Sequence, residues 1–144
     1  MNDLKLITVL FRTKNTVESA IINDLKRFDV NINTFAVLEQ LYHKGSSKIN
    51  EICEKLLIPN SSMTYLIDQL EKKQLVERQF SKEDRRSIYV DLTEKGRKLI
   101  ESIFPEHEKL AKELFKVLTD EERINLLELL KKVSFSIEKW NIYL

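Results

Sequence analysis

Two short helical patterns followed directly by a charged hairpin pattern constrain the fold of this chain more than any other feature. Apolar residues recur at helical spacing over residues 49–57 and again over residues 63–70, and Pro59 separates the two segments. Proline ends a helix because it lacks a backbone N–H and clashes with the preceding turn. Either Asn60 or Ser61 is a suitable cap for the helix that follows. Two short helices joined by a tight turn predict a helix-turn-helix.

A β-hairpin is predicted immediately after these helices. The segments VERQF (76–80) and SIYVDL (87–92) alternate apolar and polar residues on either side of the loop SKEDRR (81–86). Thr93 then provides a cap for another helix. This order of elements predicts a winged helix-turn-helix over about residues 33–96.

Longer helical patterns flank the winged segment, over residues 4–28 and 98–143. Pro105 predicts a bend in the second of these, and Thr119 with Glu122 three residues later has the pattern of a capping box. Because apolar stripes at both ends of a chain need a partner, both flanking segments are predicted to be dimerisation helices. The stripe of the last helix consists of Ile124, Leu127, Leu130, Val133, Ile137 and Trp140.

Composition agrees with a mainly α fold. The chain has 144 residues with only two Gly and two Pro, so it is poor in turn formers and is predicted to form one domain over 1–144. A further helix is expected from either Asn33 or Thr34 as its cap to a stop at Gly45.

Net charge alone indicates no class of partner, because it is only +1. The single cysteine excludes an intramolecular disulfide, and no segment resembles a signal peptide or a membrane span, so the cytoplasm is the expected compartment. Basic residues are nevertheless enriched in the middle of the chain, where residues 72–86 contain six basic and three acidic side chains. They are Lys72, Lys73, Arg78, Lys82, Arg85 and Arg86, against Glu77, Glu83 and Asp84.

The second helix of the helix-turn-helix has the properties of a recognition helix. Its polar face carries hydroxyls, an amide and an aromatic ring, which are suited to base edges and phosphates in a major groove. The alternative is an ordinary solvated face with serine and threonine near the helix start. The predicted DNA contacts on this helix are Ser61, Ser62, Thr64, Tyr65 and Gln69.

The hairpin loop adds three positive charges, Lys82, Arg85 and Arg86. In isolation, solvation of the loop explains such charges. Beyond a recognition helix, however, a basic hairpin tip can reach the adjacent minor groove, where narrow A·T tracts attract arginine. Lys82 is better suited to a phosphate, which gives affinity and salt dependence without sequence information. The predicted partner is therefore double-stranded DNA.

These segments together resemble the MarR family of bacterial transcription regulators. The resemblance covers nearly the whole chain, and DRR followed by LTEKG is its most specific part. It implies a dimeric winged-helix regulator in which both chain ends interleave between subunits and each subunit presents a recognition helix and a wing to a pseudo-palindromic operator. The segments that carry the resemblance are NINTFAVLEQL, SSMTYLIDQLEKKQLVER, DRR and DLTEKGRKLI.

The resemblance also assigns roles to single residues. Asp84 and Arg86 match the D-x-R of the family wing, which implies that Arg86 enters the minor groove with Asp84 as its orienting partner. Asp68 matches a family aspartate that pairs with the wing arginine. Two positions depart from the pattern: Tyr65, where many members have arginine, leaves the operator sequence open, and Gln74 replaces a glycine that would easily adopt a left-handed conformation.

A small aromatic ligand is a second implication of the resemblance, because NINTFAVLEQLYHKG and IFPEH are similar to the subgroup of repressors that respond to quinones and phenols. Aromatic residues at helical spacing also serve simply as core. Cys53 is a candidate redox sensor, although a buried cysteine without a nearby cation tends to be inert. The predicted pocket residues are Phe11, Phe35, Tyr42, Phe104 and His107.

No enzymatic site, cofactor or metal site is predicted. His107-Glu108 begins like H-E-x-x-H, but Ala111 occupies the position of the second ligand, and two glycines cannot build a phosphate-binding loop. Two alternatives to a ligand-controlled repressor stay open. One is a metal- or thiol-responsive regulator, with Glu106, His107 and Glu108 as metal ligands. The other is a winged-helix module that binds a partner protein.

Overall fold

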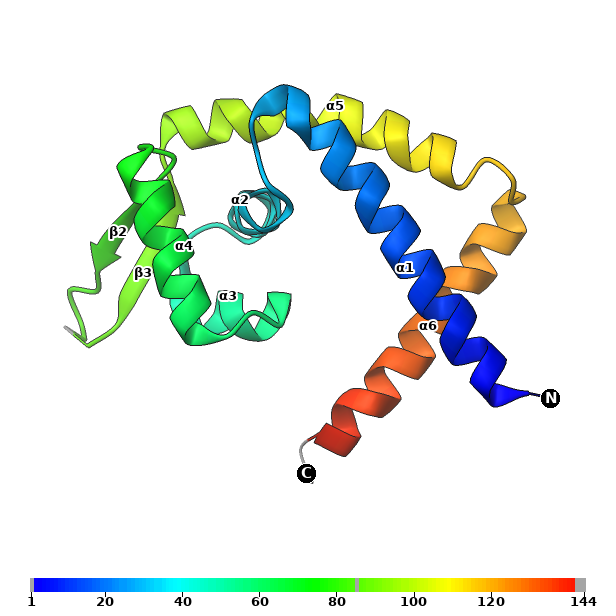
Figure 1. The fold of residues 1–144 in the computed structure, drawn as a ribbon. Coiled ribbons are helices and arrows are strands. Elements are labelled where there is room, and N and C mark those ends of the chain that lie inside the picture. The colour runs from blue at the N-terminus through cyan, green and yellow to red at the C-terminus, as the bar shows by residue number, and fades with distance from the viewer. Residues whose placement is uncertain (1, 85, 142–144) are drawn as a thin grey trace. The chain divides into compact units, whose positions relative to one another are not determined.

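The computed structural model describes residues 2–84 and 86–141 of the chain. It is mainly helical, with one small sheet (Figure 1), and it divides into two compact units, Met1–Glu108 and Lys109–Leu144. The elements are α1 (Asp3–Leu25), a 3₁₀ turn η1 (Lys26–Phe28), α2 (Ile32–Lys44), β1 (Ser47–Lys48), α3 (Ile49–Leu56), α4 (Asn60–Lys72), β2 (Val76–Phe80), β3 (Ile88–Leu92), α5 (Glu94–Leu114) and α6 (Asp120–Asn141).

The predicted winged helix-turn-helix is confirmed. Helices α3 and α4 form the helix-turn-helix, and β2 pairs with β3 as an antiparallel hairpin in which Val76 lies opposite Leu92 and Phe80 opposite Ile88. A third strand, β1, extends the sheet in the order β1-β3-β2, with Ser47 opposite Val90. The sequence did not predict β1 because two residues are too short to show alternation.

One hydrophobic core lies between α2, α3, α4, the sheet and the first half of α5. Buried apolar residues begin at Leu25 and end at Ile103, and we call residues 25–103 the winged lobe. Burial of this many apolar side chains stabilises the lobe, and all of these side chains come from a single chain. The largest fully buried side chains are Leu25, Leu38, Leu41, Ile52, Met63, Ile67, Leu70, Ile100 and Ile103.

Two of the predicted helix starts were wrong by one to three residues. The cap of α2 is Asn31, whose side-chain oxygen accepts a hydrogen bond from the Thr34 N–H at 2.8 Å, so neither Asn33 nor Thr34 caps this helix. Helix α4 follows Pro59 without a side-chain cap, which leaves Asn60 and Ser61 exposed in its first turn.

The other two helix starts are confirmed. Thr93 Oγ1 accepts a hydrogen bond from the Gly96 N–H at 3.0 Å. Thr119 and Glu122 form the reciprocal capping box, with N–H to side-chain distances of 2.8 and 3.2 Å. Helix α5 continues through Pro105 and ends at Leu114.

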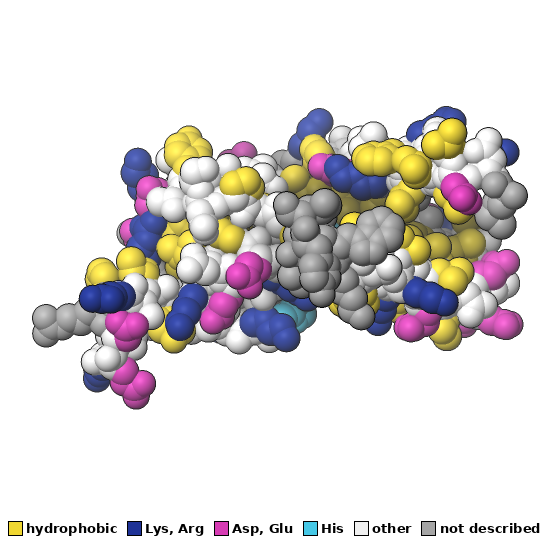
Figure 2. Space-filling view, turned by 90° about the horizontal axis from the view of Figure 1, so that it is seen from below, with side chains coloured by type: hydrophobic (Ala, Val, Ile, Leu, Met, Phe, Trp, Pro, Cys, Tyr) yellow, Lys and Arg dark blue, Asp and Glu magenta, His cyan; other side chains and the backbone are white. Residues whose placement is uncertain are grey.

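The terminal helices bury little of their apolar surface. In α1 only Leu25 is buried, whereas Leu4 is 73% and Phe11 64% exposed. In α6 every residue from 120 to 138 is exposed, including Leu127 at 52% and Ile137 at 45%. Hydrophobic side chains are accordingly visible on the surface in Figure 2. Among the described residues, no helix is long and apolar enough to cross a membrane.

Candidate nucleic-acid interface

Helix α4 separates an apolar face from a polar one. Met63, Ile67 and Leu70 are buried in the core of the winged lobe, at the spacing of one helix face. On the outer side, Ser61, Ser62, Thr64 and Tyr65 are exposed and Gln69 is half-buried. The structure therefore brings all five predicted contact residues of this helix together outside the core.

Two of these side chains have contacts or an exposure that bear on what they can bind. Thr64 Oγ1 donates its proton to the Asn60 carbonyl at 3.0 Å, so the hydroxyl can only accept a further hydrogen bond. Tyr65 is 67% exposed and projects an aromatic ring from the helix. An exposed aromatic ring with a hydroxyl at its tip can contact thymine methyl groups and polar base edges together.

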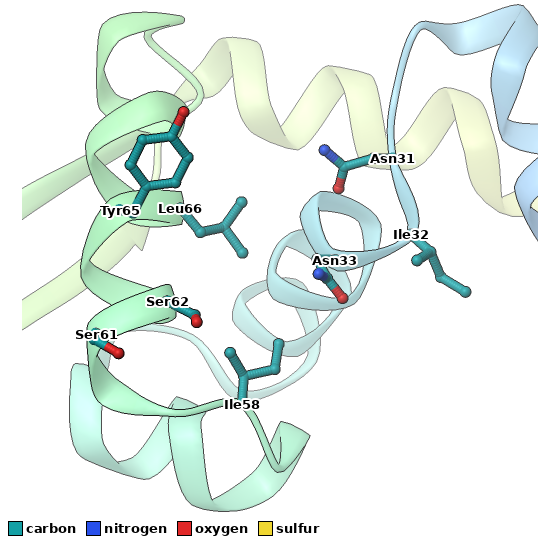
Figure 3. A pocket seen from close by; sticks show the side chains of 8 residues that line it. All are labelled: Asn31, Ile32, Asn33, Ile58, Ser61, Ser62, Tyr65 and Leu66. Carbon is teal, nitrogen blue, oxygen red and sulfur yellow. The ribbon is translucent and has the colours of Figure 1, made fainter.

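A hollow of about 530 Å³ lies beside the polar face, between α4 and the start of α2. Figure 3 shows Ser62 and Leu66 extending from α4 toward α2, with Asn33 on the opposite side. Because Asn31 provides the cap, Asn33 is exposed at this edge, and the sequence missed it as a surface polar group. The hollow is lined by Asn31, Ile32, Asn33, Ile58, Ser61, Ser62, Tyr65 and Leu66.

Asp84 shapes the wing loop through the backbone. Its carboxylate accepts hydrogen bonds from the Arg86 N–H at 2.9 Å and from Ser87 Oγ at 3.2 Å. This turn leaves Lys82 and Arg86 exposed, and charged side chains of both signs surround the projecting wing in Figure 2. Arg85, the third predicted basic contact, lies outside the described residues.

Arg78 of β2, and not the wing arginine, is the partner of Asp68. Its guanidinium lies 2.5 Å from Asp68 Oδ1 and 2.9 Å from Glu71 Oε1, and its backbone N–H donates to Glu71 Oε2 at 3.1 Å. Burial lowers the pKa of Arg78, but the hydrogen bonds and charges of Asp68 and Glu71 raise it to a net value above the ordinary one. These contacts, which we call the Arg78 clamp, hold β2 of the wing against α4, and the charge of Arg78 is paired with carboxylates of the same chain.

Gln74 adopts the left-handed conformation that the family glycine would supply. Its φ is +61°, and it terminates α4 with hydrogen bonds from its N–H to the Glu71 carbonyl and from the Leu75 N–H to the Leu70 carbonyl, both at 2.9 Å. This pair of bonds is the Schellman arrangement. The helix end is therefore regular despite the substitution of glycine by glutamine.

The start of α5 is fixed against this same helix end. Thr93 Oγ1 donates to the Gln74 carbonyl at 2.5 Å, and Lys95 Nζ donates to the Lys73 carbonyl at 3.0 Å. A Cβ built on Gly96 would lie 2.0 Å from the Leu75 carbonyl oxygen. The threonine and the glycine of LTEKG thus have a physical explanation: one caps α5 and bonds to the end of α4, and the other allows their backbones to touch.

Four of the five predicted pocket residues gather between α2 and α5. The ring centroids of Phe35 and His107 are 4.7 Å apart, and those of Tyr42 and Phe104 are 4.9 Å apart. Phe35 is buried and the other three are half-buried, so these rings pack on one another. Phe11, the fifth, is exposed on α1.

Cys53 lies on the inner face of α3 and is 8% exposed. Burial raises the pKa of its thiol, with a smaller contribution from Glu54, which disfavours the reactive thiolate. The described residues contain no group of three or more His, Cys, Asp or Glu that could hold a metal ion. Glu106, one of the three ligands in the metal alternative, forms an ion pair with Arg27, with 3.2 Å between Arg27 Nη2 and Glu106 Oε2.

Comparison with known proteins places this geometry in a family. The model of the MarR family matches residues 30–88, which include α2 to α4, β2 and the wing loop. The transcriptional regulator MhqR of Bacillus subtilis is 37% identical over 138 residues, or 96% of this chain and 95% of MhqR. The transcriptional repressor MdtR of the same organism is 27% identical over 96% of this chain and 88% of MdtR.

A solved structure agrees with these relatives. A mutant of MarR from E. coli, solved in complex with operator DNA, superposes with a TM-score of 0.83 at 27% identity, over 90% of this chain and 93% of the other. The fold and the exposed polar helix beside a wing define a winged-helix DNA-binding protein. The chain belongs to the MarR family of transcriptional regulators.

Proposed function

We propose that this protein is a homodimeric repressor that binds a pseudo-palindromic operator and is released by a small phenolic or quinone-like ligand. The observation that carries the proposal is the exposed polar face of α4, with Tyr65 at its centre, on the same lobe as an exposed wing arginine, Arg86. A helix held rigidly on its apolar side and free on its polar side suits insertion into a major groove.

Each contact residue has a distinct role in this proposal. On α4, the outer polar residues contact base edges and neighbouring phosphates, and Thr64 accepts a hydrogen bond from a donor on a base edge. Arg86 enters the minor groove in the orientation that Asp84 sets, Arg85 adds a second basic group there, and Lys82 contacts a phosphate. The α4 residues are Ser61, Ser62, Thr64, Tyr65 and Gln69.

Dimerisation uses the uncovered faces of α1 and α6. Contiguous apolar surface of this kind on a water-exposed helix marks a protein contact. In the dimer, two recognition helices enter successive major grooves about one helical turn, roughly 34–36 Å, apart. In this proposal residues 1–144 form one MarR-type domain. The protein acts in the cytoplasm, because the operator DNA lies there.

Release follows from a change in that spacing. A ligand that binds more tightly to the arrangement with wrongly spaced helices shifts the population away from the DNA-bound form. The rings of Phe35, Tyr42, Phe104 and His107 lie between α2 and α5, and opening a space among them would accept an aromatic ligand. Phe11 of α1 is the fifth proposed contact. The repressor name of the relative MdtR supports repression over activation.

Fluorescence anisotropy with the promoter of its own gene and a scrambled duplex tests the proposal, with and without a panel of phenols and quinones. Specific binding that one compound abolishes is the expected result. Specific binding that no compound affects would reject the ligand and direct attention to Cys53 or to metals. Equal binding to both duplexes would instead favour the protein-interaction module.

A further inference from the structure

We propose that a hollow between α4 and the wing is the seat of a DNA backbone phosphate, contacted by Lys48, Asn50 and Asn60, none of which the sequence pattern indicated. This proposal rests on the proposed function and adds a sequence-independent subsite to it. The hollow measures about 450 Å³ and we call it the wing hollow. It is lined by Lys48, Ile49, Asn50, Asn60, Thr64, Arg86, Ser87 and Ile88.

The geometry of a duplex requires a backbone strand at this place. If α4 occupies a major groove and the wing occupies the adjacent minor groove, one sugar-phosphate strand separates the two. That strand must cross the protein surface between α4 and the wing. The wing hollow is such a surface, since Asn60 and Thr64 belong to α4 while Arg86 and Ser87 belong to the wing loop.

The lining has the charge that a phosphate requires. Two of its eight residues, Lys48 and Arg86, are cationic, and none is acidic. The wing tip differs, because Glu83 and Asp84 lie beside its basic residues. A phosphate oxygen therefore meets less repulsion in the wing hollow than at the tip.

Hydrogen bonding within the lobe shows which groups of the lining can donate to a phosphate. Thr64 Oγ1 already donates to the Asn60 carbonyl, and Ser87 Oγ already donates to Asp84 Oδ2. Both hydroxyls can only accept, and a phosphate diester oxygen at neutral pH also only accepts. The remaining side-chain donors are the ammonium of Lys48, the amides of Asn50 and Asn60, and the guanidinium of Arg86.

Lys48 is held in place for this role. It lies on β1 opposite Tyr89 of β3, and its Nζ is 5.8 Å from the centre of the Tyr89 ring. A cation–π contact orients the ammonium while leaving its charge unneutralised, unlike the carboxylates of the Arg78 clamp. A side chain that is half-buried and oriented before binding loses less entropy when it binds a phosphate.

The test is a salt titration of Lys48→Gln. Binding to the promoter duplex and to the scrambled duplex is measured by anisotropy over a range of salt concentrations. We expect weaker binding to both duplexes by the same factor, and a slope of log K against log salt that is smaller by about 0.9 for each subunit on the DNA. Lys48→Arg, which keeps the charge, should restore most of the slope.

Matched variants complete the test. Lys26→Gln removes one exposed charge from η1, outside the wing hollow, and should leave the slope close to that of the wild type. Asn60→Asp places a negative charge in the hollow and should weaken binding to both duplexes. Thermal unfolding of each variant identifies any that fails to fold. If Lys48→Gln fails to fold, Asn60→Asp retains the test, because binding of this variant to both duplexes should still weaken.

The outcomes separate this proposal from the proposed function. An unchanged slope in Lys48→Gln, or a loss confined to the promoter duplex, overturns the phosphate seat while operator binding stands. A wild type without preference for the promoter overturns operator recognition, and a reduced slope in Lys48→Gln still supports the seat. If the wild type binds neither duplex at low salt, both proposals fall.

Discussion

The winged lobe and the terminal helices use apolar residues in opposite ways. In the lobe, side chains such as Leu41, Met63 and Ile100 are fully buried within a single chain. In α1 and α6, residues such as Leu4, Leu127 and Ile137 keep about half or more of their surface exposed. The lobe thus covers its apolar side chains within one chain, whereas each terminal helix has an apolar face that only another surface can cover. Stability of the lobe and assembly of the protein should respond to different mutations.

The largest expected effect comes from Leu127→Asp in α6. A buried charge without a partner costs about 3–5 kcal/mol, so we expect the dimer dissociation constant to rise by about a hundredfold or more. Sedimentation equilibrium measures the change. Ile137→Asp should raise the dissociation constant similarly, because Ile137 lies in the same helix and is 45% exposed in the single chain.

The matched control is Phe80→Asp, at an apolar position of the wing that is 70% exposed. Since the wing is outside the predicted interface, this variant should remain a dimer. A stable dimer of both Leu127→Asp and Ile137→Asp would show that α6 is not the interface and would remove the contrast between the two regions.

A smaller but still large effect is expected inside the winged lobe, for Gly96→Ala. Because its Cβ would lie 2.0 Å from the Leu75 carbonyl oxygen, α4 and α5 must separate, and we expect a loss of about 3 kcal/mol in the free energy of unfolding. Gly45→Ala is the comparison, since φ is +77° but nothing lies within 4 Å of the added Cβ. A conformational strain of about 1–2 kcal/mol remains there, because a φ of +77° with a ψ of −163° favours glycine. Chemical denaturation that shows equal losses for both would contradict the close approach.

Arg86→Ala tests operator binding separately from stability and assembly, because Arg86 lies outside both the hydrophobic core and the predicted dimer interface. Arg86 is exposed, so we expect an unchanged fold and dimer but operator binding weaker by about 1–3 kcal/mol. Lys82→Ala is the partner experiment, with a loss shared by specific and scrambled duplexes. Unchanged operator affinity of Arg86→Ala in a gel-shift titration, with a normal circular dichroism spectrum, would remove the wing from the reading surface.

The smallest expected effect concerns the Arg78 clamp. Arg78→Gln removes ion pairs to Asp68 and Glu71 that are partly exposed, so the free energy of unfolding should fall by about 1 kcal/mol. The loss of operator affinity on Arg86→Ala should then be smaller in the Arg78→Gln background, because the wing is no longer fixed to α4. Strict additivity of the two DNA-binding losses in this double-mutant cycle would mean that the clamp does not position the wing.

Sequence patterns predicted most of the fold because each element carried its own local signal. The period of apolar residues in α4, the alternation in β2 and β3, and the caps at Thr93 and Thr119 are properties of neighbouring residues. Strand β1 was missed because its identity depends on pairing with β3, which is distant in the chain. Local signals likewise could not decide that Asn31 caps α2.

The site was predictable in outline, but its hydrogen bonding was not. The polar residues of α4 and the basic loop were visible as patterns, whereas the pairing of Asp68 with Arg78 depends on how β2 packs beside α4. Lys48 and Asn60 gave no signal of a DNA contact, since only the fold brings them to one hollow. Gln74 shows the reverse case: an unfavourable residue is accommodated by the bonds of the helix end.

The central claim is that the winged lobe reads an operator only when the terminal helices join two copies. The most direct test is an anisotropy titration of wild type and Leu127→Asp against the same promoter duplex and its scrambled version. The account predicts that the wild type prefers the promoter by a factor of about 10³ or more, and that the variant, with its lobe still folded, loses nearly all of that preference. A monomeric variant that keeps the full preference, or a dimeric wild type that shows none, would contradict it.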